Sequence, residues 1–162
     1  MEETAALMVV AEIAVALAGF SGVAAALRHG ASETWPDDDR DRFVDLVVHS
    51  GIALFASLVP LMFAHRAGVN SELWSSSSFI WAGCASVGIA LAARRTLLHP
   101  NQRGRGVRSV LTAIAFLGTL VLQLYNGFVL QEFWPYLGGL IMNLGFAFIQ
   151  FMALAIPRPR SD

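Results

Sequence analysis

Long apolar stretches separated by short charged segments constrain the fold of this chain more than any other feature. An uncharged run of about 18 or more apolar residues is typical of a helix that crosses a bilayer. Five such runs occur, at about residues 5–27, 43–63, 73–93, 110–130 and 137–156. The segments between them are too short for a soluble domain. The sequence therefore predicts an all-α, polytopic integral membrane protein in which residues 1–162 form a single transmembrane helical domain.

The composition and the two helix starts support this interpretation. Hydrophobic residues make up 56% of the chain and charged residues 14%, whereas soluble domains carry about 25% charged residues. The sequence begins MEETAAL, with two acids and no base, and a secretory signal begins with basic residues, so we interpret the first run as a permanent helix. Pro36, followed by three aspartates, indicates the start of the second helix, because proline and acids favour a first turn.

The distribution of arginine predicts how the chain is threaded. Arg66 is the one arginine on its side of the five runs, and the other ten lie on the opposite side. Positive charge marks the cytoplasmic side, so we expect the N-terminus outside and the C-terminus in the cytoplasm, in a bacterial cytoplasmic (inner) membrane. We expect no nucleic acid partner, because no nucleic-acid-binding module is present. The arginines expected to contact anionic lipids are Arg94, Arg95, Arg103, Arg105 and Arg108.

Glu12 is an acid inside the first apolar run. The residues after it, 13–27, would cover only about 22 Å at 1.5 Å per residue, less than the roughly 30 Å of hydrocarbon, so Glu12 must lie within the membrane. Three amide side chains reach a similar depth from their own helix ends. The sequence predicts an outer-leaflet polar layer, for transport or for interhelical contact, made of Glu12, Gln123, Asn126 and Asn143.

Small residues recur along the first run and predict close helix packing. They form a surface that lets another backbone approach, and Glu12 lies at its edge. We therefore expect Glu12 to face protein and to donate a hydrogen bond to Gln123 or Asn143. The small residues at intervals of four are Ala14, Ala18, Gly22 and Ala26.

Asp45 and His49 form a second polar pair, on the cytoplasmic side, four residues apart on one helix face. An aspartate beside a histidine can tune a proton relay or orient a metal-binding imidazole. We favour a plain interfacial pair, because such spacings are common. His49 is the one histidine well inside a run, so a haem held by two histidines of one chain is disfavoured. A haem shared by two subunits, with one His49 from each, remains an alternative.

The sequence carries no enzyme signature. It has no glycine-rich phosphate loop, metalloprotease helix or nucleophile elbow, and Cys84 is its one cysteine. We expect no enzymatic activity, no metal and no cofactor. The function we expect is a small homo-oligomeric channel or carrier for protons, a cation or a small polar solute, because ionisable residues in a membrane are often functional. The alternative is a structural or accessory subunit of a membrane complex.

Overall fold

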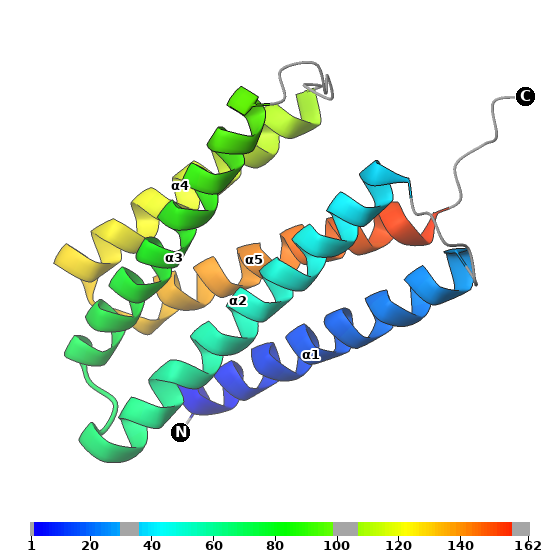
Figure 1. The fold of residues 1–162 in the computed structure, drawn as a ribbon. Coiled ribbons are helices and arrows are strands. Elements are labelled where there is room, and N and C mark those ends of the chain that lie inside the picture. Colours follow the sequence, from blue (N-terminus) through cyan, green and yellow to red (C-terminus); the bar gives the residue numbers. More distant parts are fainter. Residues whose placement is uncertain (1, 30–35, 99–106, 157–162) are drawn as a thin grey trace, which may run out of the picture. The chain divides into compact units, whose positions relative to one another are not determined.

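Five α-helices and one short π-helix make up the described part of the chain. The computed structural model describes residues 2–29, 36–98 and 107–156, with side chains at 2–27, 36, 39–65, 68–90 and 111–156. The elements, drawn in Figure 1, are α1 (Glu2–His29), α2 (Asp37–Ala67), α3 (Ser71–Leu98), α4 (Val107–Tyr125), the π-helix η1 (Asn126–Leu130) and α5 (Phe133–Ala155). The predicted all-α fold with five helices is confirmed.

The predicted apolar runs correspond to these helices, with one shifted boundary. The first three runs lie inside α1, α2 and α3, and the fourth continues from α4 into η1. The fifth run was expected to begin at residue 137, but α5 begins at Phe133. Pro135 lies in its first turn, where the missing N–H of proline leaves no intrahelical hydrogen bond unmade. The helix therefore starts one turn earlier than the hydropathy indicates.

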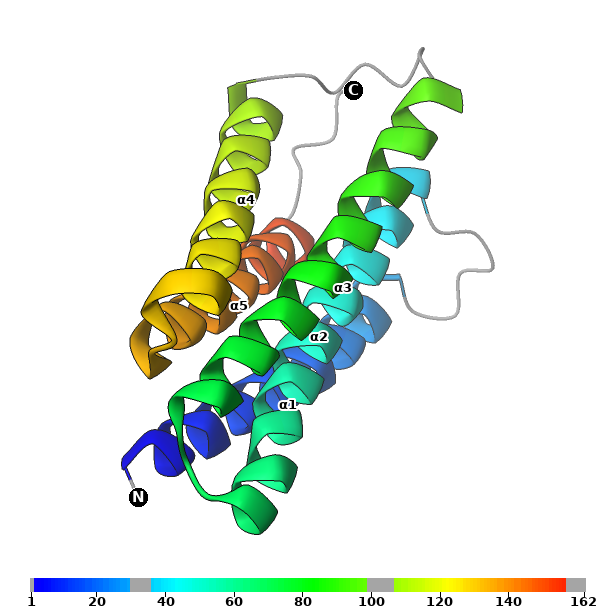
Figure 2. The ribbon, with the colours of Figure 1, turned by 90° about the vertical axis from the view of Figure 1, so that its left-hand side faces the viewer.

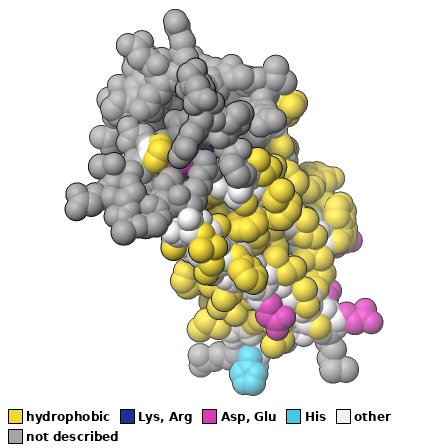
Figure 3. Space-filling view, turned by 90° about the vertical axis from the view of Figure 1, so that its right-hand side faces the viewer, with side chains coloured by type: hydrophobic (Ala, Val, Ile, Leu, Met, Phe, Trp, Pro, Cys, Tyr) yellow, Lys and Arg dark blue, Asp and Glu magenta, His cyan; other side chains and the backbone are white. Residues whose placement is uncertain are grey.

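Four of the helices are long and apolar enough to cross a membrane. The candidate spans are Glu2–Leu27, Asp39–His65, Leu111–Leu130 and Phe133–Ala155. Helix α3 is 28 residues long, and its part with described side chains, residues 71–90, is not among the four candidate spans. On the face shown in Figure 3, most of the described side chains are hydrophobic. Length and composition thus support contact with a lipid bilayer.

Backbone hydrogen bonds define both ends of α2. The start of α2 is closed by backbone hydrogen bonds from Asp39 and Arg40 to the carbonyl of Pro36, which confirms the predicted helix start. Gly68 ends α2 with a positive φ of 79°, and its N–H donates to the carbonyl of Ala64, as in a helix that terminates in the left-handed conformation.

The contacts divide the chain into two compact units. The first contains Met1–Leu58 with Leu140–Asp162, and the second contains Val59–Gly139. That residues 1–162 form one domain stays a prediction.

In the first unit, α1 packs with the first part of α2 and the later part of α5. Its core is a cluster of Leu46, Ala147 and Leu154, against which Leu17, Phe43 and Phe151 pack. One guanidinium nitrogen of Arg42 on α2 donates to the carbonyl of Ala153 on α5 at 3.5 Å.

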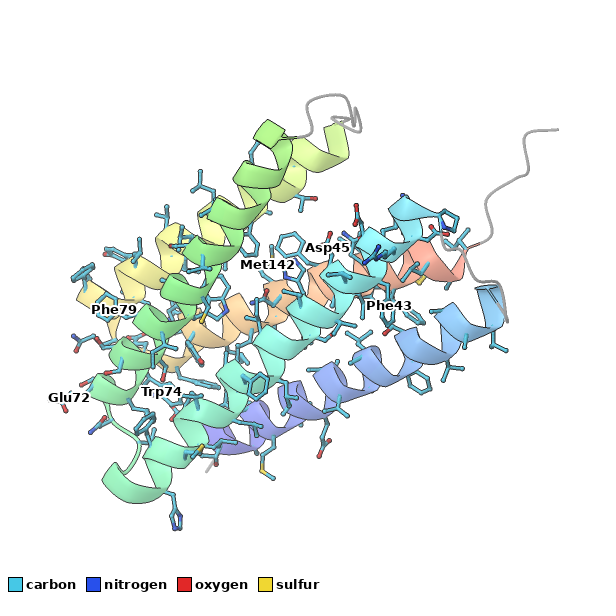
Figure 4. The ribbon with its side chains drawn as sticks, viewed as in Figure 1. Phe43, Asp45, Glu72, Trp74, Phe79 and Met142 are labelled. Carbon is cyan, nitrogen blue, oxygen red and sulfur yellow. The ribbon has the colours of Figure 1, made fainter. Side chains whose placement is uncertain are left out.

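In the second unit, α3 packs against α4 and η1. The two long helices run in opposite directions, as Figure 2 shows. Aromatic rings line the contacts of α3 with η1 and with the start of α5: Trp74 lies 4.9 Å from Phe133 and 6.0 Å from Tyr136 between ring centroids, and Phe79 lies 4.7 Å from Phe128. Figure 4 labels Trp74 and Phe79 on α3.

Candidate polar sites in the long apolar helices

His49 on α2 is hydrogen-bonded to Asn143 on α5, within the first unit. The imidazole Nδ1 lies 3.0 Å from the amide Oδ1. An amide oxygen accepts, so Nδ1–H donates and the neutral ring carries its lone pair on Nε2. The ring is partly buried and lies 5.6 Å from that of Phe146 between centroids. Asn143 thus fixes the orientation of a titratable ring between two apolar helices.

This pair lies near the middle of the two helices. At 1.5 Å per residue, His49 is about 4.5 Å from the midpoint of its candidate span and Asn143 about 1.5 Å from the midpoint of its own. The sequence placed Asn143 nearer the outer surface because it counted from residue 137. The earlier start of α5 moves Asn143 about 6 Å deeper, to the level at which His49 lies on α2.

Polar groups beside this pair are left without partners. Asn143 and Ser50 are each 1% exposed. Among the described residues, neither the Nδ2 of Asn143 nor the Oγ of Ser50 has a hydrogen-bond partner. Leaving a buried donor unsatisfied costs about 1–3 kcal/mol. Asp45, labelled in Figure 4, lies one turn from His49 on α2. The predicted interfacial pairing of Asp45 with His49 stays a prediction.

Glu12 is exposed on α1 of the first unit. Among the residues whose side chains are described, no hydrogen bond or ion pair of Glu12 is found. The expected hydrogen bond to Asn143 is therefore not formed in the first unit, and the expected bond to Gln123, which belongs to the second unit, stays a prediction. The reason is rotation: the buried face of α1 is formed by Leu7, Val10, Ala14, Ser21 and Ala25, and Glu12 lies on the opposite side of the helix.

The predicted small-residue surface of α1 is divided between buried and exposed positions. Ala14 is 1% exposed and belongs to the buried face. Ala18 is partly buried, whereas Gly22 and Ala26 are exposed. A Cβ atom built at Gly22 would meet nothing within 4 Å. Their predicted role in helix packing stays a prediction for the exposed members.

Comparison of the chain with protein-family models, with curated proteins and with solved structures finds no match. Among the described residues, no three His, Cys, Asp or Glu side chains gather closely enough to hold a metal ion.

Gln123 holds the end of α4 against the start of α5 in the second unit. It is fully buried, and its Nε2 donates to the carbonyl of Pro135 at 2.6 Å. Proline removes an N–H from the first turn of α5 but leaves its carbonyl as an acceptor. The amide thus joins two helices that are consecutive in the chain.

Asn126 closes the turn between η1 and α5. Its Nδ2 donates to the Oγ of Ser78 at 2.8 Å and to the carbonyl of Glu132 at 2.9 Å, and its Oδ1 accepts from the N–H of Glu132 at 3.0 Å. Its own carbonyl accepts from the N–H of Gln131, which has a left-handed φ of 54°. One fully buried amide therefore satisfies the backbone groups that the end of the helix would leave open.

Helix α3 supplies hydrogen-bond partners that were not predicted from the sequence. Ser75 donates to the carbonyl of Gly127 at 2.7 Å, and Ser78 accepts from Asn126. The available signal is spacing: Ser75 and Ser78 are three apart, as are Gln123 and Asn126, so each pair shares a helix face.

Two further polar atoms lie one turn along from the contact between Ser78 and Asn126. They are the Nε1 of Trp81 and the Oε1 of Gln123, both buried and without a hydrogen-bond partner among the described residues. One is a donor and the other an acceptor.

The four residues of the predicted polar layer are divided between the two units. Glu12 and Asn143 lie in the first unit, and Gln123 and Asn126 in the second. Whether they form one layer stays a prediction. Of the arginines expected to contact lipid, Arg103 and Arg105 lie outside the described residues, and the side chains of Arg94, Arg95 and Arg108 are likewise not described.

Proposed function

We propose that this protein is a small homo-oligomeric membrane channel or carrier that moves protons, or a cation coupled to protons, with His49 as the group that binds and releases the proton. The observation that carries the proposal is the hydrogen bond from His49 Nδ1 to Asn143 Oδ1 at 3.0 Å. It fixes a titratable ring near the midpoints of two candidate spans. Ionisable residues at such depth are costly, and they often mark proton or ion pathways.

The chemistry needs a ring that can exchange a proton near neutral pH, which histidine alone provides unperturbed. With Nδ1–H held by Asn143, a proton enters and leaves at Nε2, and the hydrogen bond keeps the ring in place during both steps. The unpartnered donors of Asn143 and Ser50 favour a path, because groups that serve only to hold helices together would be expected to satisfy one another.

The proposed threading has five spans, with the N-terminus outside and the C-terminus in the cytoplasm of a bacterial inner membrane. The ten-to-one division of arginines supports it. Helix α3 is the fifth span. Two of its serines have their hydroxyls hydrogen-bonded to η1, which lowers the cost of placing them in hydrocarbon.

A second candidate, a structural or accessory subunit without transport activity, is favoured by a different observation. Gln123 and Asn126, expected to line the path, donate hydrogen bonds to backbone carbonyls and hold the turn between α4 and α5. In this second candidate, the pairing of His49 with Asn143 would also serve only to hold two helices together.

Proton flux into liposomes separates the two candidates. The purified chain, reconstituted with an internal pH-sensitive dye, should dissipate an imposed pH gradient when a potential drives it. His49→Gln should lower the flux at least tenfold, because an amide cannot exchange a proton. The matched control is His65→Gln, an exposed histidine at the other end of the same span, which should leave flux unchanged. A folded parent without flux would support the accessory role, and undiminished flux in His49→Gln would remove His49 from the path.

A further inference from the structure

Two polar side chains in the interior of the first unit each carry a hydrogen-bonding atom that is left over. Ser50 on α2 and Asn143 on α5 are each 1% exposed. Neither the Oγ of Ser50 nor the Nδ2 of Asn143 has a hydrogen-bond partner among the described residues. The other amide atom of Asn143 is in use, because its Oδ1 accepts from His49. Buried polar groups are almost always hydrogen-bonded, so these two atoms indicate a further partner.

Ser50 and Asn143 lie at the same level of the two helices. Of two hydrogen bonds between α2 and α5, the one later in α2 is the earlier in α5, so the helices run in opposite directions (Figure 1). Leu46 of α2 and Ala147 of α5 belong to the core cluster of this unit. Ser50 follows Leu46 by four residues and Asn143 precedes Ala147 by four, and residues four apart share a helix face. Both steps lead the same way from the cluster and bring Ser50 opposite Asn143.

Helix α1 brings an alanine to this level. Leu17 packs against the same core cluster, and α1 runs in the same direction as α5 (Figure 1). The turn before Leu17 carries Ala14, which is 1% exposed and comes to the level of Asn143. Its methyl group is small and neither donates nor accepts. Ser21, the buried polar residue among those described on α1, lies one turn beyond Leu17 and donates to the carbonyl of Ala18 at 2.6 Å. The further partner therefore does not come from the described part of α1.

We infer that Ser50 and Asn143 bind one water molecule between them. Water both donates and accepts, so it can accept from the Nδ2–H of Asn143 and donate to the Oγ of Ser50. A buried water needs about two to four polar partners, and these two side chains supply two. An ion is disfavoured, because neither side chain is charged and a charge taken out of water without an opposite charge is costly.

The bound water orients Asn143. With Nδ2 donating to the water, Oδ1 is turned towards His49 and accepts from the ring, which is the arrangement found between α2 and α5. The inference goes beyond the proposed function and does not depend on it. A chain that carries no protons has the same two groups to satisfy, and hydration can be measured without flux.

Solid-state NMR of the full chain in lipid bilayers tests the inference, because polarisation passes from water protons to a side-chain amide only over a short distance. The chain has four asparagines, and nitrogen-15 labelling of their side chains gives one signal each, assigned by its loss in Asn143→Ala or Asn126→Ala. Asn126 is the matched control, because it is also fully buried but its Nδ2 donates to Ser78 and to Glu132. Polarisation should build up about threefold faster or more at Asn143, because a bound water lies at hydrogen-bond distance.

Variants of α2 then locate the site. Ser50→Ala removes one of the two ligands and should lower the transfer to Asn143 to the level of Asn126, whereas Ser50→Thr keeps a hydroxyl and should retain it. Ser57→Ala is the control, because Ser57 shares a face of α2 with Ser50, is fully buried and donates to the carbonyl of Ala53; it should leave the transfer unchanged. Equal transfer at Asn143 and Asn126 in the parent would overturn the inference and would mean that another part of the chain satisfies Asn143. Undiminished transfer in Ser50→Ala would overturn the role of Ser50.

Discussion

The Nε2 atom of Gln123 occupies the space beside Gly139: a Cβ atom built on that glycine would lie 2.5 Å from it. The same Nε2 atom donates to the carbonyl of Pro135. Position 139 therefore has to be glycine, because any larger residue would push the side-chain amide of Gln123 out of its hydrogen bond.

Gly139→Ala should lower the free energy of unfolding by about 1–3 kcal/mol, the usual cost of overpacking a filled site. Gly138→Ala is the control, because a Cβ atom there would meet nothing within 4 Å, and it should be neutral or slightly stabilising. Unfolding in mixed micelles with increasing denaturing detergent measures both. In the Gln123→Ala background, Gly139→Ala should cost much less; an equal cost in both backgrounds would show that Gln123 is not the obstacle.

Asn126→Ala should destabilise the protein more than loss of any single hydrogen bond in the second unit. The change leaves the N–H and carbonyl of Glu132 and the hydroxyl of Ser78 without the partner they have in the native chain. Buried unsatisfied groups cost about 1–3 kcal/mol each. Ser78→Ala should cost less, and Ser76→Ala, an exposed serine of the same helix, should be neutral. Thermal melting in detergent gives the order, and an Asn126→Ala variant as stable as the parent would contradict it.

His49 and Asn143 should be energetically coupled. Asn143→Ala, His49→Gln and the double variant form a cycle whose interaction energy should be about 0.6–1.7 kcal/mol, the range for hydrogen bonds between membrane helices. The control cycle pairs Asn143→Ala with His65→Gln, which should be additive, because His65 lies at the far end of the span.

The purified parent should have no absorption near 400 nm. A Soret band that disappears in His49→Gln would instead indicate a haem between subunits.

The threading predicts opposite outcomes for two fusions. Alkaline phosphatase, which is active only outside the cytoplasm, should be inactive when fused after Asp162 and active when fused after Val69, between α2 and α3. A fluorescent protein should give the reverse pattern. Phosphatase activity at both positions, or at neither, would place Val69 and Asp162 on the same side. The chain between them, from α3 to α5, would then cross the membrane an even number of times.

Apolar runs predict the helices of this chain well, because each is long and bounded by proline, glycine or charged residues. They do not predict how each helix is rotated. Glu12 was expected beside a surface that includes Ala14 and Gly22, yet Ala14 is buried and Gly22 exposed, since both faces of α1 carry small residues. With alanine and glycine all around a helix, hydropathy gives no preferred direction for its buried side.

Pairs between helices were predicted least well. The bond from His49 to Asn143 joins residues 94 positions apart, and its prediction needs the depth of each residue to within a turn. The depth of Asn143 follows from the start of α5 at Phe133, and that start is predicted only if Pro135 is counted as part of the helix. The role of Asn126 depends in turn on Ser78 of α3, which lies 48 positions earlier in the chain.

The serines of α3 also bear on the order in which the chain enters the membrane. The insertion machinery accepts a segment according to its apolarity, and the four consecutive serines at residues 75–78 make the start of α3 less apolar than the rest of the helix. The groups that pair with Ser75 and Ser78 lie in η1, some fifty residues later in synthesis. In the proposed threading, the hydroxyls of Ser75 and Ser78 therefore meet their partners only after η1 has been made, so the hydrogen bonding at the start of α3 is completed late in synthesis.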